Sequence, residues 1–526
     1  MTPESRQFWS KSIVTEAIGG IPYRIYADRP HRISELFSFA SFWGDRPYVI
    51  QGDRVLTFAG LRDASGSKAL QLQRSGIAAG DRVMILGWNS PDWVVNFWAV
   101  VRLGAVPVLG NAWWSPEEIE YAIYFTEPKL VLADDRCAGR VSQSLLTEAW
   151  GGEAGTGEAP DVTVPDDENA PAVIIFTSGT EGRAKAVVLA HRSFIASMMM
   201  MMHITRRLPY DVSAPKSEIC LHTGPLFHIG GPHAMMRGVV SGNTLVFPSG
   251  RFSTSEALEL IEKHRIERWT AVPTMLTRLL DDEGIATRDL GSLRSIGMGG
   301  APVHRELLDR VRKQLPGVDA RVAIGYGLSE NAGQATAASA ENALRKPGSS
   351  GRPLPLVEIS FKEREGLPDG EILLRSPTQM LGYFGNPNSP IDADGWLHTG
   401  DLGKLDDEGL LWITGRCKDI IIRGGENIAP AAVERALTGI SAVAEAAVLG
   451  IPHPDLGEEV AAFVVIREDS EATAETLSAE LRRTLASFAV PSRWHIQYEP
   501  LPTNQTGKVE RKALLELLRE GPQPEE

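Results

Sequence analysis

Residues 172–190 carry the sequence AVIIF-TSGTEGRAK-AVVLA, in which two apolar runs flank a polar, glycine-containing one. The outer runs (172–176 and 186–190) are rich in β-branched residues and predict two buried strands. The central run (177–185) offers hydroxyls, backbone N–H groups and a lysine, which together can hold a phosphate. The next helix is expected to begin only at Ser193, so the phosphate would rest on loop amides. The competing interpretation is a polar hairpin turn, and a Walker A pattern occurs nowhere in the chain.

Short apolar runs alternate with segments of helical spacing on both sides of this loop. The predicted strands are 81–86, 106–109, 129–133, 219–225, 244–247, 269–272 and 293–298. The predicted helices are 57–75, 91–103, 116–125, 255–264 and 273–280. This alternation is typical of an α/β fold with parallel or mixed sheets and flanking helices.

The pattern changes in the last third of the chain. Residues 351–414 contain alternating apolar runs separated by turn residues, which predicts a β-rich subdomain of a large N-terminal domain (1–415). Residues 416–520 predict a small α+β C-terminal domain, in which 474–488 is expected to be one helix. The tail, 521–526, is expected to be disordered.

Composition excludes several classes of protein. The 526 residues carry 53 Lys and Arg against 67 Asp and Glu, a net charge of −14 that argues against a nucleic-acid binder. Cys137, Cys220 and Cys417 are far apart, so neither a disulfide framework nor a CxxC metal site is expected. The start lacks a secretory pattern, and the most apolar stretch (93–114) is interrupted by Asn, Arg, Gly and Pro. These features predict a cytoplasmic protein without stable membrane insertion.

Five further blocks accompany the 177–185 loop in a fixed order. They are PLFH (225–228), GYGLSE (325–330), GWLHTGD (395–401), GRCKDIIIRGGEN (415–427) and PTNQTGKVER (502–511). With the loop, these blocks resemble the signature of the adenylate-forming (AMP-binding) superfamily, and more specifically its acyl-CoA synthetase branch. The resemblance implies ATP-dependent activation of a carboxylate to acyl-AMP and pyrophosphate, followed by transfer to coenzyme A. Glu181 and Ala184 depart from the usual loop residues, and the role of Glu181 stays open.

The resemblance also implies a nucleotide site. Its residues are Thr177, Ser178, Gly179, Thr180, Glu181, Lys185, Gly299, Gly300, Ala301, Pro302, Gly325, Tyr326, Gly327, Ser329, Asp401 and Arg416. Within this set Tyr326 is expected to stack on adenine and Asp401 to bind the ribose hydroxyls. Glu330 is the implied Mg²⁺ ligand, since a hard carboxylate suits that ion.

The implied catalytic residues are Lys508, His228 and Glu330. Lys508 would bridge the carboxylate and the α-phosphate when the small domain closes, and a flexible ammonium suits a contact that is made and withdrawn. The block 415–418 is the expected hinge, with Lys418 at the pivot, and Gly424 and Gly425 would line the CoA path. The spacing of His222, His228 and His233 matches no standard metal-ligand pair.

The implied acyl pocket consists of Phe227, His228, Gly230, Gly231, Met298 and Gly299. His228 follows Phe227 where amino-acid-activating relatives carry Asp, which argues against an α-amino acid substrate. Gly230 and Gly231 stand where several aryl-acid ligases carry a bulky aromatic, and we expect this to widen the pocket. The expected substrate is therefore a bulky or branched apolar acid, ring-bearing or of medium chain length.

Three functional hypotheses follow. The first is an acyl-CoA ligase that uses ATP, Mg²⁺ and CoA. The second is the same adenylation with transfer to an amine, or luciferase-like oxygen chemistry. The third is a non-enzymatic nucleotide-binding protein, which the presence of Lys508, Glu330 and Asp401 disfavours. The expected partners are the small-molecule carboxylate, ATP and CoA, and a homodimer is left open.

Overall fold

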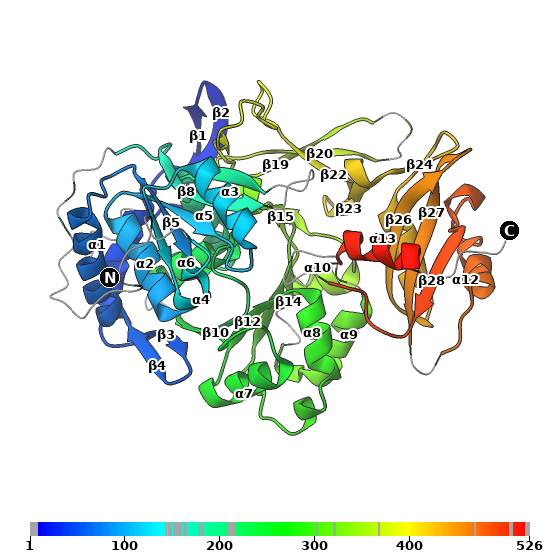
Figure 1. The fold of residues 1–526 in the computed structure, drawn as a ribbon, viewed down its shortest axis with the longest axis horizontal. Coiled ribbons are helices and arrows are strands. Elements are labelled where there is room, and N and C mark those ends of the chain that lie inside the picture. Colours follow the sequence, from blue (N-terminus) through cyan, green and yellow to red (C-terminus); the bar gives the residue numbers. More distant parts are fainter. Residues whose placement is uncertain are drawn as a thin grey trace. The chain divides into compact units, whose positions relative to one another are not determined.

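The computed structural model in Figure 1 forms two compact units, Met1–Glu358 with Arg375–Leu397, and Ile359–Leu374 with His398–Glu526. The structure describes residues 9–141, 145, 150, 160, 162, 166–177, 184–208, 217–299, 303, 305–318, 322–364, 366, 369–467, 470–503 and 509–520. The predicted β-rich segment 351–414 is divided between the units, with most of its strands in the second. The predicted hinge at 415–418 lies inside the second unit and stays a prediction.

The first unit contains a seven-stranded sheet of order β14-β13-β12-β10-β11-β3-β4. Its strands are β3 (Pro47–Gln51), β4 (Arg54–Thr57), β10 (Ile219–His222), β11 (Thr244–Val246), β12 (Arg268–Ala271), β13 (Ser295–Met298) and β14 (Val322–Ile324). All neighbours pair in parallel except the β3–β4 hairpin. The parallel core confirms the α/β prediction.

A six-stranded sheet of order β21-β9-β8-β6-β5-β7 is the second large element of this unit. Its strands are β5 (Arg82–Leu86), β6 (Val106–Gly110), β7 (Leu130–Ala133), β8 (Pro171–Thr177), β9 (Lys185–Ala190) and β21 (Gly382–Tyr383). β5, β6, β7 and β8 pair in parallel, whereas β9 runs antiparallel to β8 and β21 antiparallel to β9. The sheet is therefore mixed, with its antiparallel strands at one edge.

Helices pack on both sheets, and Figure 1 shows α7, α8 and α9 gathered around the seven-stranded sheet. The helices of the first unit are η2 (Ile33–Phe42), α1 (Phe58–Arg74), α2 (Pro91–Arg102), α3 (Pro116–Thr126), α4 (Asp135–Ala138), α5 (His191–Ile204), α6 (Gly230–Ser241), α7 (Thr254–His264), α8 (Pro273–Asp281), η4 (Glu283–Ala286), α9 (Arg305–Gln314), η5 (Pro316–Val318), η6 (Ser329–Asn331) and α10 (Ala340–Arg345). Local sequence explains where they start: Ser115 and Glu118 form a capping box with Pro116 at the first position of α3. No helix in the described ranges has both the length and the apolar character needed to cross a membrane.

Several short elements of this unit were not predicted. They are the hairpin β1 (Ile13–Ile18) with β2 (Ile21–Tyr26), the pair β15 (Gly327–Leu328) with β16 (Gly333–Gln334), and the pair β17 (Thr336–Ala337) with β18 (Arg352–Pro353). The strands of the last two pairs are only two residues long and carry no measurable alternation, so a period-2 pattern cannot detect them.

The second unit contains two sheets. A four-stranded sheet joins β19 (Glu358–Lys362), β20 (Gly370–Arg375), β22 (Leu397–Leu405) and β23 (Leu411–Arg416) in that order. A five-stranded sheet joins β24 (Ile421–Arg423), β25 (Glu426–Ile428), β26 (Val443–His453), β27 (Gly457–Ile466) and β28 (Arg493–Gln497). Its helices are η7 (Cys417–Asp419), α11 (Pro430–Thr438), α12 (Ala474–Leu481), η8 (Ser487–Ala489) and α13 (Arg511–Glu520). A C-terminal domain of strands and helices is thus confirmed, and its predicted bounds, 416–520, stay a prediction.

The single helix predicted over 474–488 is wrong in its second half. α12 ends at Leu481, and Ala486 then adopts extended backbone ahead of η8. The reason is tertiary packing, because the change of direction places Leu485 and Phe488 against the apolar core of the five-stranded sheet. Burial of these side chains outweighs the local helical preference.

Candidate active site

The carboxyl edges of the two sheets of the first unit meet at the loop that follows β10. The side-chain Oδ1 of Asn89, which follows β5, accepts a hydrogen bond from the backbone N–H of Leu226 at 2.8 Å. Its Nδ2 donates to the carbonyl of Gly224, also at 2.8 Å. Ligands of open α/β sheets bind beyond the carboxyl ends of the strands, so this junction is where a site is expected.

The predicted phosphate loop is the connection of a β-hairpin. β8 and β9 are antiparallel, and Thr177 lies opposite Lys185 in their register. The strand–loop–strand prediction is confirmed for both flanks, and α5 begins at His191, two residues before the predicted start. Ser178, Gly179, Thr180 and Glu181 lie outside the described residues, so their role stays a prediction.

Lys185 and the predicted metal ligand Glu330 both contact Tyr383. The Tyr383 hydroxyl donates a hydrogen bond to Glu330 Oε1 at 2.9 Å. The Lys185 Nζ atom lies 4.9 Å from the centre of the Tyr383 ring, a cation–π distance. Burial, followed by the nearby Glu330 carboxylate, raises the pKa of Tyr383, so the hydroxyl keeps the proton that it donates. Tyr383 was missed from the sequence, because it lies in a two-residue strand.

The GYGLSE block follows β14 and turns through a very tight hairpin. An added Cβ at Gly325 would lie 2.8 Å from the carbonyl oxygen of Thr336, and one at Gly327 would lie 2.1 Å from the carbonyl oxygen of Gly333. Glycine is therefore required at both positions by close approach. Tyr326, between them, is 8% exposed, and Ser329 begins η6.

Gly299, the first residue of the second predicted nucleotide-binding segment, lies beside this block. An added Cβ at Gly299, which follows β13, would be 3.6 Å from the carbonyl of Gly325. Gly300, Ala301 and Pro302 lie outside the described residues. The backbone proximity agrees with a shared site, whereas the adenine contact of Tyr326 stays a prediction.

The predicted acyl pocket residues Phe227 and His228 belong to an aromatic cluster. The Trp113 ring lies 5.1 Å from Phe227 and 6.4 Å from His228, and the Trp88 ring lies 6.3 Å from Trp113. Trp113 follows β6 and Trp88 follows β5, so both come from the carboxyl edge of the six-stranded sheet. The two tryptophans were not predicted, although their positions directly after predicted strands were a usable signal.

The other two histidines of this region are buried. Burial is the main cause that lowers the pKa of His222 to about 4, and the same cause lowers that of His233 to about 4. His233 Nε2 lies 2.7 Å from the carbonyl oxygen of Ala332. Both side chains are therefore neutral at physiological pH.

The two glycines of the predicted pocket differ in their surroundings. An added Cβ at Gly230 would meet nothing within 4 Å, in agreement with open space there. One at Gly231 would lie 2.3 Å from the carbonyl oxygen of Leu226. The expectation that Gly231 widens the pocket is therefore wrong: glycine is required there because α6 packs against the backbone. Met298 is 2% exposed and belongs to the core around the seven-stranded sheet.

In the second unit, Asp401 and Arg416 occupy facing positions of β22 and β23. The Arg416 Nε atom is 2.9 Å from Asp401 Oδ1. The Asp401 side chain is 10% exposed and that of Arg416 is 54% exposed, so the pair lies at the surface with the carboxylate recessed. The structure thus brings two predicted nucleotide-binding residues together.

The predicted hinge and CoA residues come shortly after Arg416 in the chain. Lys418 lies in η7, where partial burial lowers its pKa, and the neighbouring Asp419 pairs with Arg511 at 3.3 Å. Gly424 and Gly425 form the two-residue turn between β24 and β25, with φ of +58° and +91°. Such a turn requires glycine or a close substitute at both positions. Lys508 lies outside the described residues, in the connection between the paired residues Thr503 and Val509.

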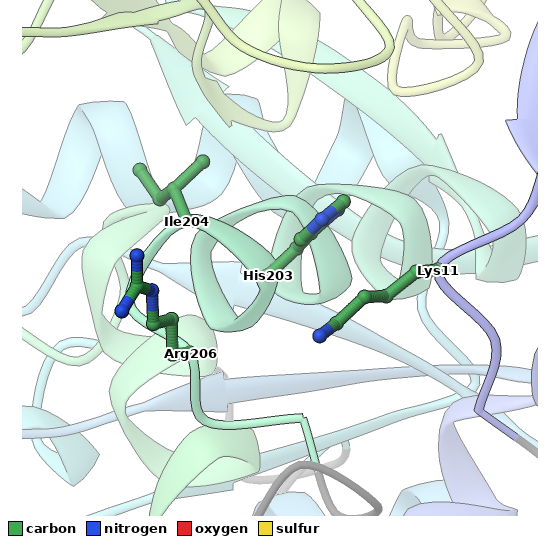
Figure 2. Close-up of a pocket in the computed structure, with 4 residues that line it drawn as sticks. All are labelled: Lys11, His203, Ile204 and Arg206. Atoms are coloured by element: carbon green, nitrogen blue, oxygen red, sulfur yellow. The ribbon is translucent and has the colours of Figure 1, made fainter.

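A cavity of about 360 Å³ lies elsewhere, at the C-terminal end of α5. Figure 2 shows the side chains that line it, Lys11, His203, Ile204 and Arg206. His203 Nδ1 is 2.9 Å from the hydroxyl of Tyr26. None of these four residues belongs to the predicted nucleotide site or acyl pocket.

Comparison with known proteins adds to this geometry. The family model described as AMP-binding enzyme matches residues 36–384, and the model described as AMP-binding enzyme C-terminal domain matches residues 432–508. The chain is 35% identical over 499 residues to a 2-succinylbenzoate–CoA ligase of Bacillus velezensis, covering 92% of this chain and 97% of the relative. It is 33% identical to a fatty acid–[acyl-carrier-protein] ligase of Streptomyces coeruleorubidus, covering 89% and 92%. Its fold resembles o-succinylbenzoate coenzyme A synthetase from Bacillus subtilis in complex with ATP and magnesium ion, with a TM-score of 0.75, 30% identity, and coverage of 91% and 98%.

Proposed function

Because the chain belongs to the AMP-binding enzyme family, we propose that it activates a carboxylic acid with ATP and transfers the acyl group to coenzyme A. In the first step a carboxylate oxygen attacks the α-phosphorus, and pyrophosphate leaves. In the second step the CoA sulfur attacks the acyl carbonyl carbon, its proton is lost, and AMP leaves. Membership of the family confirms the resemblance to adenylate-forming enzymes.

The observation that carries the proposal is the joint contact of Lys185 and Glu330 with Tyr383. Adenylation brings two anions together and expels a third, so it requires positive charge and positioning more than acid–base catalysis. Lys185 supplies such a charge at the end of the phosphate hairpin. Lys508 supplies a second charge, which we assign to the bridge between the carboxylate and the α-phosphate.

Glu330 suits a magnesium site. Mg²⁺ in nucleotide enzymes is usually bound through one or two carboxylates together with substrate phosphates. The described residues hold no cluster of three or more His, Cys, Asp or Glu side chains that could form an all-protein metal site, and a single carboxylate therefore fits this mode. The chemistry supplied by the ion is neutralisation of charge on the ATP phosphates.

The remaining nucleotide contacts are assigned to three further side chains. Asp401 accepts hydrogen bonds from the ribose hydroxyls, for which a recessed carboxylate is well suited. Arg416 orients Asp401 and reaches the nucleotide. Tyr326 packs against the adenine ring, and Gly424 with Gly425 lines the path of CoA.

The acyl substrate is a bulky apolar acid, ring-bearing or of medium chain length. Support comes from the aromatic cluster of Trp88, Trp113, Phe227 and His228, because aromatic side chains contact rings and methylene chains without requiring polar partners. The open space at Gly230 also leaves room for a bulky group. We also assign the backbone of Gly299, which follows β13, to the wall of this pocket.

A second candidate differs only in the acceptor. Adenylation followed by transfer to an amine, or luciferase-like chemistry, would use the same nucleotide site. The Streptomyces relative bears the name of a ligase that uses an acyl carrier protein, so a carrier thiol is a further acceptor to be compared. A cytoplasmic location and a homodimer stay predictions.

The test is a pyrophosphate-release assay over a panel of carboxylates, with and without CoA, followed by mass spectrometry of the products. We expect pyrophosphate release with ring-bearing or medium-chain acids, and acyl-CoA plus AMP only when CoA is present. The same assay with an amine or an acyl carrier protein in place of CoA separates the alternative acceptors. If ATP binding is demonstrated but none of the acids in the panel causes release of pyrophosphate, the proposed activity is contradicted.

A further inference from the structure

Residues 378–384, which are buried over 378–380 and partly or fully exposed over 381–384, connect the phosphate hairpin to the element that carries Glu330. At one end it is bonded to η6: the Met380 N–H donates to the Glu330 carbonyl at 2.8 Å, and the Thr378 hydroxyl donates to Asn331 Oδ1 at 2.9 Å. Thr378 and Asn331 have no exposed surface. The position of the Glu330 backbone is therefore fixed by this segment.

At its other end the segment forms β21 and pairs with β9. Gly382 lies opposite Val188 and Tyr383 opposite Val187. The N–H groups of Leu381 and Phe384 donate to the carbonyls of Val188 and Ala186, both at 2.8 Å. The last of these bonds is made by Ala186, the neighbour of Lys185. Segment 378–384 is therefore bonded both to β9, which carries Lys185, and to η6, which carries Glu330.

Tyr383 extends this connection from the backbone to the functional side chains. Its hydroxyl donates to Glu330 Oε1 at 2.9 Å, and its ring faces Lys185 Nζ at 4.9 Å. We propose that Tyr383 is a positioning residue that fixes the Glu330 carboxylate and the Lys185 ammonium relative to each other, so that both engage one magnesium–triphosphate unit. This inference rests on the proposed function, and it assigns a role to a residue outside the sequence motifs considered above.

The two contacts of Tyr383 are separable by mutation. Tyr383→Phe keeps the ring face beside Lys185 but removes the donor to Glu330. Tyr383→Leu removes both contacts. Hydrogen bonds to a ligating carboxylate tune metal binding, and losing such a partner typically weakens metal affinity by ~10–100-fold.

A purely structural role for Tyr383 is the alternative, and Tyr48 provides the matched control. The Tyr48 hydroxyl donates to the Met235 carbonyl at 2.9 Å, and the residue is fully buried in the same unit. Tyr48→Phe therefore also removes one buried hydroxyl hydrogen bond, but at a residue to which no magnesium or nucleotide contact is assigned. A structural effect would lower the melting temperature in both variants without any selectivity for magnesium.

The experiment is calorimetric titration of ATP into the full-length protein, with no carboxylate or CoA, once in Mg²⁺ and once in EDTA. We expect Tyr383→Phe to weaken binding of ATP ~10-fold or more in Mg²⁺ and to leave binding in EDTA within twofold of wild type. Tyr383→Leu should weaken both, because it also releases Lys185. Tyr48→Phe should match wild type in both titrations.

Two results would overturn the inference: Tyr383→Phe binding ATP as wild type does in Mg²⁺, or losing the same factor with and without Mg²⁺. Neither result affects the proposed function, provided that the wild type binds ATP and releases pyrophosphate with an acid. Absence of ATP binding by the wild type would overturn both the proposed function and the role of Tyr383.

Discussion

Arg416 Nε lies 2.9 Å from Asp401 Oδ1, across the β22–β23 pair. Because more than half of the Arg416 side chain is exposed, the ion pair contributes little to folding, as exposed pairs typically contribute ~0–1 kcal/mol. Its more direct consequence is orientation, since the guanidinium holds the carboxylate that we assign to the ribose.

Asp401→Ala and Arg416→Ala should therefore weaken AMP and ATP binding without a large change in melting temperature. We expect the double variant to lose less affinity than the two single losses combined, because Arg416 acts partly through Asp401. Titration of AMP into the four proteins of this cycle measures the coupling. Fully additive losses would mean that Arg416 contacts the nucleotide independently of Asp401.

Lys508→Ala should affect one half-reaction. Removing a group that stabilises charge only in the transition state typically lowers the rate by ~10²–10³-fold, so adenylation should fall by about that factor. Formation of the thioester from preformed acyl-adenylate and CoA should be retained. Lys512→Ala, which removes an exposed lysine of α13, is the control and should leave both steps unchanged. Equal losses in both steps for Lys508→Ala would rule out this role.

Gly230→Phe and Gly231→Ala should have different effects. The first places a ring in open space, so large acids should lose turnover while short acids keep it. The second forces a methyl group against the Leu226 carbonyl, where overpacking typically costs ~1–3 kcal/mol, and should lower stability and reduce turnover of every acid alike. Turnover across a chain-length series and thermal melts distinguish the two. Uniform loss with Gly230→Phe would remove the support for a pocket at this position.

Lys418→Pro tests the predicted hinge. Both Lys508 and the Gly424–Gly425 turn are assigned to one reaction, so we expect the small domain to use two orientations, with residues near Lys418 absorbing the backbone change. Proline fixes φ near −65° and removes an N–H donor, which should trap one orientation. Rapid-quench assays should show pyrophosphate release in a single turnover, with acyl-CoA formation strongly slowed. Wild-type rates for both steps would place the pivot elsewhere or exclude the two-orientation mechanism.

Acid should destabilise the protein partly through His222. Its pKa is about 4 in the folded state against 6.5 for the free side chain, so between these values the unfolded chain binds a proton that the folded chain does not. The stabilisation is complete above pH 6.5 and is lost as the pH falls toward 4, by up to ~3 kcal/mol at ~1.4 kcal/mol per pH unit. His222→Met should flatten the decline in the free energy of unfolding measured by urea titration from pH 7 to 4.5. An unchanged slope in His222→Met would refute this assignment.

The parts of the fold with long local patterns could be predicted from the sequence. The strands around the 177–185 loop, and α1, α2 and α3, were found within about two residues, because apolar spacing and caps such as Ser115 are local signals. β21 could not be found, because two residues show no period and their pairing with Val187 and Val188 is a long-range contact. For the same reason Tyr383 was absent from the predicted site.

The function of Gly231 was also misjudged from sequence. A glycine looks the same in a sequence whether its missing side chain makes room for a ligand or for a neighbouring backbone. The distance to Leu226 resolves the two cases, and only tertiary structure supplies it. Trp113 illustrates the converse, since its position after a predicted strand was visible but its approach to Phe227 required the arrangement of two sheets.

The late position of β21 in the chain has a consequence for biosynthesis. β9 is synthesised roughly 190 residues before its partner, which at ~5–20 residues per second leaves its outer N–H and C=O groups without that partner for about 10–40 s. An uncovered strand edge can pair with another nascent chain. Substitutions that weaken β21 should therefore reduce the yield of native protein during translation more than they reduce the stability of the finished molecule.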